Sequence, residues 1–110
     1  MSARLHLICR DAKGLVCLDP KGAIYRSEAW ALTSAEVAKL AGGRVYFHQT
    51  KAEPSYFGGH VLDAEPFQGG NSDPERFVLR LKAERDAKGV VWDEAGRSHA
   101  MAWSSGVLDD

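Results

Sequence analysis

Only one stretch of this chain has the pattern of a capped helix, and that helix is short. Residues Thr33 to Glu36 (TSAE) fit the capping box, in which the threonine caps the N3 amide and the glutamate reaches back to the cap residue. Gly42 is the expected stop. The pattern predicts a helix over residues 34–41, about two turns long. A helix of this length cannot carry a domain core, so β-strands must supply it.

Alternation of apolar and polar residues with a period of two predicts those strands. The clearest example follows Pro74, and its residues Phe77, Leu79 and Leu81 are expected to face the core. In the first strand, the same alternation places His6 on a solvated face. Residues 106–110 are expected to fray. Residues 90–92 and 98–103 are predicted to form a hairpin. The other predicted extended segments are residues 4–10, 15–18, 23–25, 45–48 and 59–62.

The length and composition indicate a single globular domain over residues 1–110. Apolar residues make up 45% of the chain and charged residues 26%, values that argue against disorder. Many short strands with frequent turns and one helix predict an α+β fold, in which a small, mostly antiparallel sheet curls into a barrel. The alternative is an open antiparallel sheet with the helix packed on one face.

Charge and cysteine content exclude several classes of protein. The net charge is −1, with +3 on residues 1–60 and −4 on residues 61–110, so only a modest basic face is expected. No apolar run is long enough to span a bilayer, and the N-terminus lacks a signal-peptide pattern, which predicts a cytoplasmic protein with no membrane partner. Cys9 and Cys17 are expected to be core thiols, although a hairpin of 4–10 with 15–18 would allow a bridge.

The densest mixture of aromatic, amide, hydroxyl and imidazole side chains lies between Gly43 and Val61, where a polar loop joins two predicted strands. Loops on a rigid scaffold tend to carry function, and aromatic rings beside amide and hydroxyl groups suit a planar ligand. Trp92 is expected at the wall of this pocket. The alternative is that the aromatic residues are core and that Lys51 with Glu53 is a solvated pair. The expected ligand-binding residues are Tyr46, His48, Gln49, Lys51, Ser55, Tyr56 and Trp92.

No metal or cofactor site is predicted, because the four histidines do not have ligand spacing within one element. An enzyme is the alternative to a binding domain. It would be a small hydrolase or nucleotide-processing protein that uses His48 with Ser55 or Lys51. A partner-binding module is a third possibility, and the oligomeric state is left open.

The order of elements resembles that of the PUA-like superfamily, especially its EVE and ASCH branches. The residues that carry the resemblance are the helix followed by Gly42-Gly43, the strand Val45 to His48, the aromatic-Gly-Gly-His60-Val61 segment and the acidic bend Asp63 to Pro66. The resemblance covers roughly Leu32 to Ala83. It implies a small barrel that binds RNA or modified DNA bases, with a pocket at Tyr46, His48, Gln49, Ser55 and Trp92. The resulting expectation is a non-catalytic domain that recognises a nucleobase or modified nucleic acid.

Overall fold

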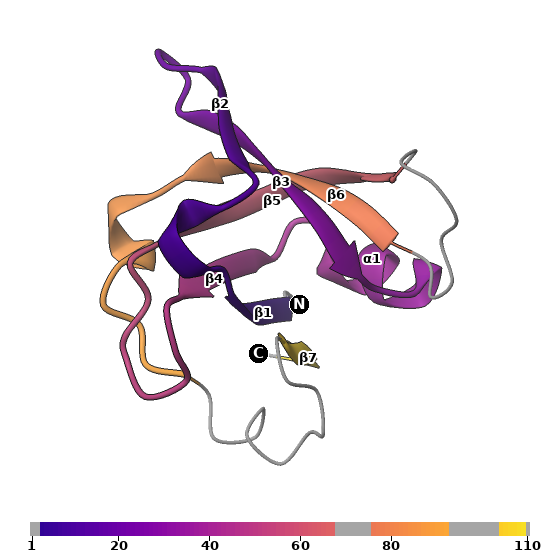
Figure 1. Ribbon diagram of the computed structural model, residues 1–110. Helices are drawn as coiled ribbons and strands as arrows, with labels where there is room; N and C mark the ends of the chain where they lie inside the picture. The colour runs from indigo at the N-terminus through magenta and orange to yellow at the C-terminus, as the bar shows by residue number, and fades with distance from the viewer. Residues whose placement is uncertain (1–2, 68–75, 93–103, 110) are drawn as a thin grey trace.

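A computed structural model of the protein describes residues 3–67, 76–92 and 104–109. These residues form an α+β fold in which one mixed sheet curls without closing (Figure 1). The strand order is β2-β3-β6-β5-β4-β1-β7. The elements in chain order are β1 (Ala3–Ile8), η1 (Arg10–Ala12), β2 (Leu15–Asp19), β3 (Ile24–Ala31), α1 (Ser34–Leu40), β4 (Arg44–His48), β5 (Phe57–Pro66), β6 (Arg76–Ala83), η2 (Arg85–Ala87) and β7 (Ser104–Asp109).

The helix prediction is confirmed in its position and in its cap. The Thr33 side chain accepts a hydrogen bond from the Glu36 amide at 3.1 Å, and the Glu36 carboxylate accepts one from the Thr33 amide at 3.0 Å. Gly42 follows the helix with a φ of +78°, a conformation that glycine adopts without steric cost. Leu40 is fully buried and anchors α1 to the sheet, whereas Ala41 is exposed.

The predicted faces of β6 are confirmed, because its alternate residues Phe77, Leu79 and Leu81 are buried in the core. The same core cluster includes Leu5 and Leu7 of β1, which lies toward the other end of the sheet. Strands β6 and β1 are separated in the sheet by β5 and β4. Shared packing between them therefore requires the curl seen in Figure 1.

The two central glycines of β5 let neighbouring strands approach closely. A Cβ atom on Gly59 would lie 2.0 Å from the carbonyl oxygen of Lys82 in β6, and one on Gly58 would lie 2.3 Å from that of Val45 in β4. Both distances are too short for any side chain, so strand packing requires glycine at these positions. At both glycines, the group that approaches closely is the backbone of a neighbouring strand.

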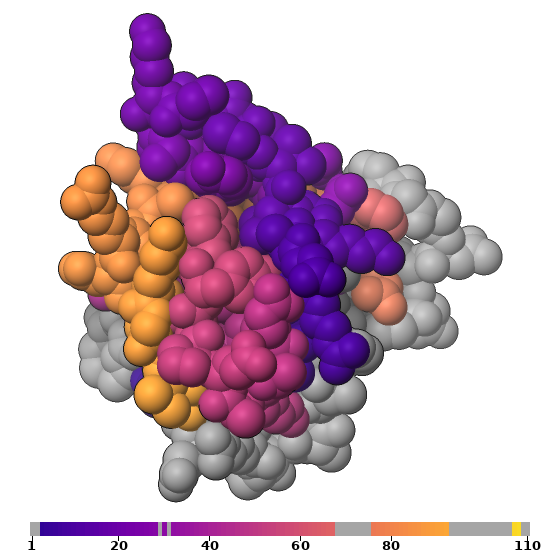
Figure 2. Space-filling model, turned by 60° about the vertical axis from the view of Figure 1, so that its left-hand side comes forward, coloured from indigo at the N-terminus to yellow at the C-terminus, as the bar shows by residue number. Residues whose placement is uncertain are grey.

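Residues 4–10 and 15–18 do not form the hairpin that would have allowed a bridge between Cys9 and Cys17. Strand β1 pairs with β4 in parallel and with β7 antiparallel, whereas β2 pairs with β3 at the other end of the sheet. The β2–β3 hairpin protrudes from the body, as Figures 1 and 2 both show. Cys9 is buried, as expected, but Cys17 is exposed on this hairpin, and both thiols are free.

Three further strand predictions need correction. Strand β3 is longer than the predicted 23–25, because its pairing with β6 supports the polar run Arg26 to Glu28. The segment predicted to fray includes most of β7, which the β1 edge stabilises. Residues 90–92 do not form a strand. The Val90 carbonyl accepts a hydrogen bond from the Ser55 amide, and the Val90 amide donates to the Ser55 hydroxyl. Residues 98–103 of the predicted hairpin lie outside the described part of the chain.

Candidate functional site

A groove of about 980 Å³ opens where the chain leaves β1 and passes β3. Its size suits a small organic ligand. Apolar and charged side chains both line it, and its lining residues are Ile8, Cys9, Arg10, Asp11, Lys13, Gly14, Glu28, Trp30 and Phe67. Figure 2 shows the indigo segment that follows β1 lying against the purple β2–β3 hairpin. The groove thus lies between the segment that follows β1 and strand β3.

One wall of the groove is a backbone turn in an unfavourable conformation. Asp11 and Ala12 have φ angles of +56° and +57°, in the left-handed region that residues with a Cβ rarely adopt. Each such residue costs about 1–2 kcal/mol unless the surroundings compensate. Strained residues of this kind persist where neighbouring groups hold them, and they cluster at functional sites. The turn of residues 10–13 is therefore held in place by other parts of the fold.

Gln49 and Tyr56 are the side chains that hold this turn. The amide oxygen of Gln49 accepts a hydrogen bond from the Asp11 backbone at 2.9 Å. The Tyr56 hydroxyl donates to the carbonyl oxygen of Cys9, and the backbone amide of Ala12 also hydrogen-bonds to that hydroxyl, which acts to lower its pKa. Both side chains come from the loop between β4 and β5 or its edge, so the turn and that loop form one unit.

The Tyr56 hydroxyl and the Cys9 thiol of this unit are neutral. Burial raises the pKa of the Tyr56 hydroxyl well above its ordinary value, and its hydrogen bond to Cys9 raises it further. Burial likewise raises the pKa of the Cys9 thiol. The thiol donates to the carbonyl oxygen of Lys13 at 3.2 Å. Cys9 is therefore a structural thiol that faces the groove, and its ability to react is limited by access and protonation.

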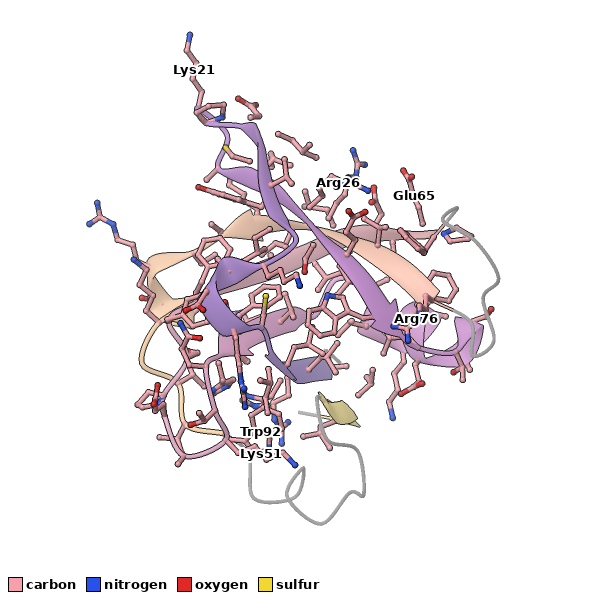
Figure 3. The ribbon with its side chains drawn as sticks, in the orientation of Figure 1. Lys21, Arg26, Lys51, Glu65, Arg76 and Trp92 are labelled. Atoms are coloured by element: carbon pink, nitrogen blue, oxygen red, sulfur yellow. The ribbon has the colours of Figure 1, made fainter. Side chains whose placement is uncertain are left out.

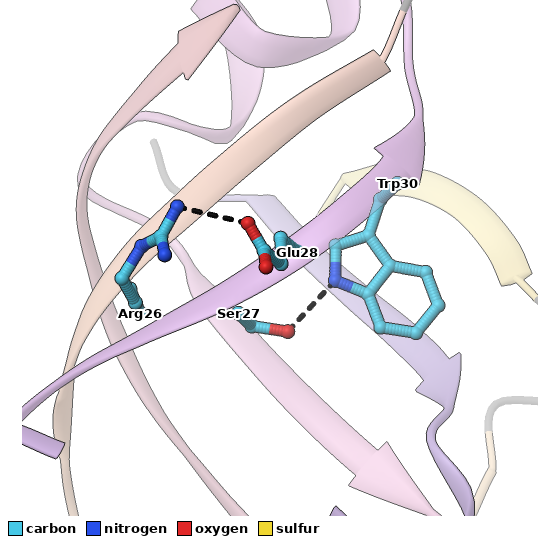
Figure 4. A network of polar contacts seen from close by, with 4 residues as sticks. All are labelled: Arg26, Ser27, Glu28 and Trp30. Atoms are coloured by element: carbon cyan, nitrogen blue, oxygen red, sulfur yellow. Dashed lines mark hydrogen bonds and ion pairs between the residues drawn. The ribbon is translucent and has the colours of Figure 1, made fainter. Parts of the chain in front are cut away.

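The opposite wall is the indole of Trp30 on β3. Its Nε1 donates to the hydroxyl of Ser27 at 2.8 Å (Figure 4). A register shift between Ser27 and Trp30 brings these two residues onto the same face of the strand. Arg26 and Glu28 form an ion pair at 2.9 Å. The indole is only partly buried, so one of its faces borders the groove, near Phe67.

A second cluster lies beneath the loop between β4 and β5 and is built around two buried histidines. The Nδ1 of His6 and the Nε2 of His48 are 2.8 Å apart. Trp92 packs against both imidazole rings, and Tyr46 packs against that of His6. The ammonium group of Lys51 lies 5.5 Å from the centre of the Trp92 ring, and Figure 3 shows the two side chains together. The prediction that His6 faces solvent is wrong, because the opposite face of β1 is also covered.

The hydrogen bonds of this cluster determine the tautomers of its histidines. The Nδ1 of His48 lies 2.9 Å from the carbonyl oxygen of Glu53, which can only accept, so Nδ1 carries the proton. Burial lowers the pKa of His48, against the weaker effect of the Glu53 hydrogen bond, and the ring is neutral. Its Nε2 therefore accepts from the Nδ1 proton of His6. The indole nitrogen of Trp92 is buried and has no hydrogen-bond partner among the described residues.

The predicted site residues thus fall into three groups. Tyr46, His48, Lys51 and Trp92 meet in the histidine cluster, whereas Gln49 and Tyr56 hold the wall of the groove. Ser55 lies elsewhere: its hydroxyl donates to the carbonyl oxygen of Ala87 at 2.5 Å and accepts from the Val90 amide at 2.9 Å. The described hydrogen bonds of His48 go to His6 and Glu53, so His48 and Ser55 have no partner in common.

The lining residues of the groove were not predicted from the sequence. Asp11 to Gly14 has the composition of an ordinary turn, and nothing in it marks left-handed residues other than glycine. The register shift beside Trp30 has no local signature in the sequence. The long-range contacts of Gln49 and Tyr56 were also invisible, because they join positions 38 and 47 residues apart.

Within residues 3–67, 76–92 and 104–109, no group of three or more His, Cys, Asp or Glu side chains is arranged to hold a metal ion. The same part of the chain contains no helix long and apolar enough to cross a membrane. No family model matches the chain, and no curated protein or solved structure matches it significantly. The resemblance to the PUA-like superfamily stays a prediction.

Proposed function

We propose that this protein is a non-catalytic binding domain that holds a nucleobase-containing ligand in the groove between the turn of residues 10–13 and β3. The observation that carries the proposal is the partly exposed indole of Trp30 in a groove of about 980 Å³. An aromatic residue on one wall suits the base of a nucleoside or nucleotide, and charged groups on the other suit the polar part of a nucleotide.

The indole of Trp30 can stack on any base, so this part of the interaction does not depend on the sequence of the nucleic acid. Stacking of a base on an aromatic side chain contributes about 1–3 kcal/mol. The Trp30 ring is held for this role because its Nε1 is bonded to Ser27 and its edge packs 6.4 Å, centre to centre, from Phe47. A ring held in the free protein loses little entropy when a ligand stacks on it.

The groove is lined by none of the residues that the sequence predicted to bind the ligand. Gln49 was one of those residues, and its amide oxygen is bonded to the Asp11 backbone. Gln49 therefore acts on the groove indirectly, by fixing the turn. RNA or DNA as the source of the base is part of the proposal, and single-stranded segments are the relevant form because their bases are accessible.

The test is a titration of the protein with nucleosides, 5′-mononucleotides and short single-stranded oligonucleotides, followed by tryptophan fluorescence and calorimetry. The Trp30→Leu variant should lose about 5- to 150-fold in affinity, the equivalent of one stacked base. Phe57→Leu is the matched control, because it shortens a partly buried aromatic residue that does not line the groove.

Binding that is equal in Trp30→Leu and wild type would place the ligand elsewhere. Absence of binding by every class of ligand would refute the proposed function.

A further inference from the structure

The charged wall of the groove indicates which part of a ligand it meets. Arg10 and Lys13 flank the strained turn and are exposed, with Asp11 as the carboxylate between them. The other carboxylate that lines the groove, Glu28, is paired with Arg26 at 2.9 Å. The turn itself brings the side chains of Arg10 and Lys13 to this wall, beside the carboxylate of Asp11. This wall therefore favours an anionic group.

We infer that the groove recognises a phosphate ester, with the turn of residues 10–13 meeting the phosphate and Gln49 and Tyr56 acting as the positioning residues of that turn. The inference rests on the proposed function and specifies the ligand further. A phosphate ester could come from a free mononucleotide or from the backbone of a nucleic acid. Both present the same oxygens to Arg10 and Lys13.

The backbone conformation of the turn is the second observation. Left-handed conformations at both Asp11 and Ala12 bring Arg10 and Lys13 around a tight reversal, closed by a hydrogen bond from the Lys13 amide to the Arg10 carbonyl at 3.2 Å. Gln49 and Tyr56 keep the reversal in this shape from behind. The two cations are thus organised before a ligand arrives, which reduces the ordering cost of binding.

The first experiment compares adenosine and guanosine with their 5′-monophosphates on the wild-type protein. The monophosphates should bind at least about tenfold more tightly, the effect of a charge-assisted hydrogen bond. Lys13→Ala and Arg10→Ala should each weaken monophosphate binding and leave nucleoside binding within about twofold. Lys21→Ala is the matched control, since Lys21 is an exposed lysine at the tip of the β2–β3 hairpin (Figure 3).

The second experiment tests the positioning role, with binding and stability measured on the same variants. Gln49→Ala should weaken monophosphate binding but not nucleoside binding, although Gln49 does not line the groove. Ala12→Gly relieves strain and should raise the melting temperature, yet a looser turn should weaken monophosphate binding. A purely structural role for the turn would move stability and affinity in the same direction.

The outcomes separate this inference from the proposed function. Equal affinity for nucleosides and monophosphates, with Trp30→Leu still impaired, would overturn the inference and leave the proposed function intact. Loss of binding in Lys21→Ala as large as in Lys13→Ala would also overturn it. Competition by inorganic phosphate and by an abasic oligonucleotide distinguishes a free nucleotide from a nucleic-acid backbone. Absence of any nucleoside or monophosphate binding would overturn both.

Discussion

His6 donates its Nδ1 proton to the Nε2 of His48 across 2.8 Å, and this contact joins neighbouring parallel strands beneath a tryptophan ring. Both rings are buried, and the proton arrangement is determined by the carbonyl oxygen of Glu53 at the far end of the chain of hydrogen bonds. The arrangement requires His48 to be neutral, because a protonated Nε2 could not accept from His6. This part of the fold is therefore sensitive to acid.

We expect the protein to lose stability as the pH falls below about 6.5, the ordinary pKa of histidine. The folded pKa of His48 is lowered, so the unfolded chain binds more protons in this range and the free energy of unfolding decreases with acidification. The loss is about 1.4 kcal/mol for each pH unit that separates the two pKa values. Urea unfolding between neutral pH and mildly acidic pH measures it.

The matched variants for this prediction are His48→Gln and His60→Gln. His60 is partly exposed and lies outside the buried histidine cluster, so its replacement removes one histidine without disturbing the contact of His6 with His48. His48→Gln should be less stable at neutral pH but should have a flatter pH profile. If the profiles of His48→Gln and wild type were parallel, the acid sensitivity would come from other groups.

Leu79→Ala should lower the free energy of unfolding by about 2–5 kcal/mol, the range for emptying a buried leucine position. Leu79 is fully buried in the centre of β6 and belongs to the main core cluster. Lys82→Ala on the exposed face of the same strand should stay within about 0.5 kcal/mol of wild type. Similar costs for the two variants in urea unfolding would contradict the assigned faces.

Thr33→Ala should cost about 1 kcal/mol, because it removes the side-chain cap of α1. The cap is reciprocal, so the double variant with Glu36→Ala should cost less than the sum of the two single variants. Thermal unfolding of the three variants completes the cycle. Strict additivity would indicate that the two hydrogen bonds of the capping box act independently.

Ser55→Ala should destabilise the protein by about 1–3 kcal/mol, since it leaves the buried Ala87 carbonyl and the Val90 amide without this partner. Thr50→Ala is the comparison, because the Thr50 hydroxyl caps a single exposed amide in the same loop at 3.2 Å. Thr50→Ala should cost clearly less in urea unfolding. An equally small effect of Ser55→Ala would show that water replaces its hydroxyl.

The sequence predicted best those features that depend on neighbouring residues. The cap at Thr33 and Glu36 spans three positions, and the faces of β6 follow from a period of two, so both could be recognised locally. His6 was placed wrongly by the same alternation, because the pattern cannot reveal that a tryptophan covers the second face of β1. The strand β7 was missed because its stability comes from pairing with β1, far away in the chain.

The candidate site was predictable in part, for the same physical reason. The loop between β4 and β5 was expected to form one pocket with Trp92, and of its polar side chains Lys51 lies against that ring. The direction in which each side chain points depends on segments that the loop meets only after folding. Gln49 points to Asp11 and Ser55 to Ala87, and neither partner is near in sequence.

The parallel pairing of β1 with β4, and its antiparallel pairing with β7, also set the order in which the molecule can assemble. Residues Ala3 to Ile8 are synthesised before their partners, which follow about 40 and 100 residues later, and this separation slows folding because long loops must close. During translation, β1 is an unpaired apolar strand until β4 has emerged, and its second edge stays open until Ser104 to Asp109 arrive. This strand is therefore the segment that a chaperone would be expected to shield on the nascent chain.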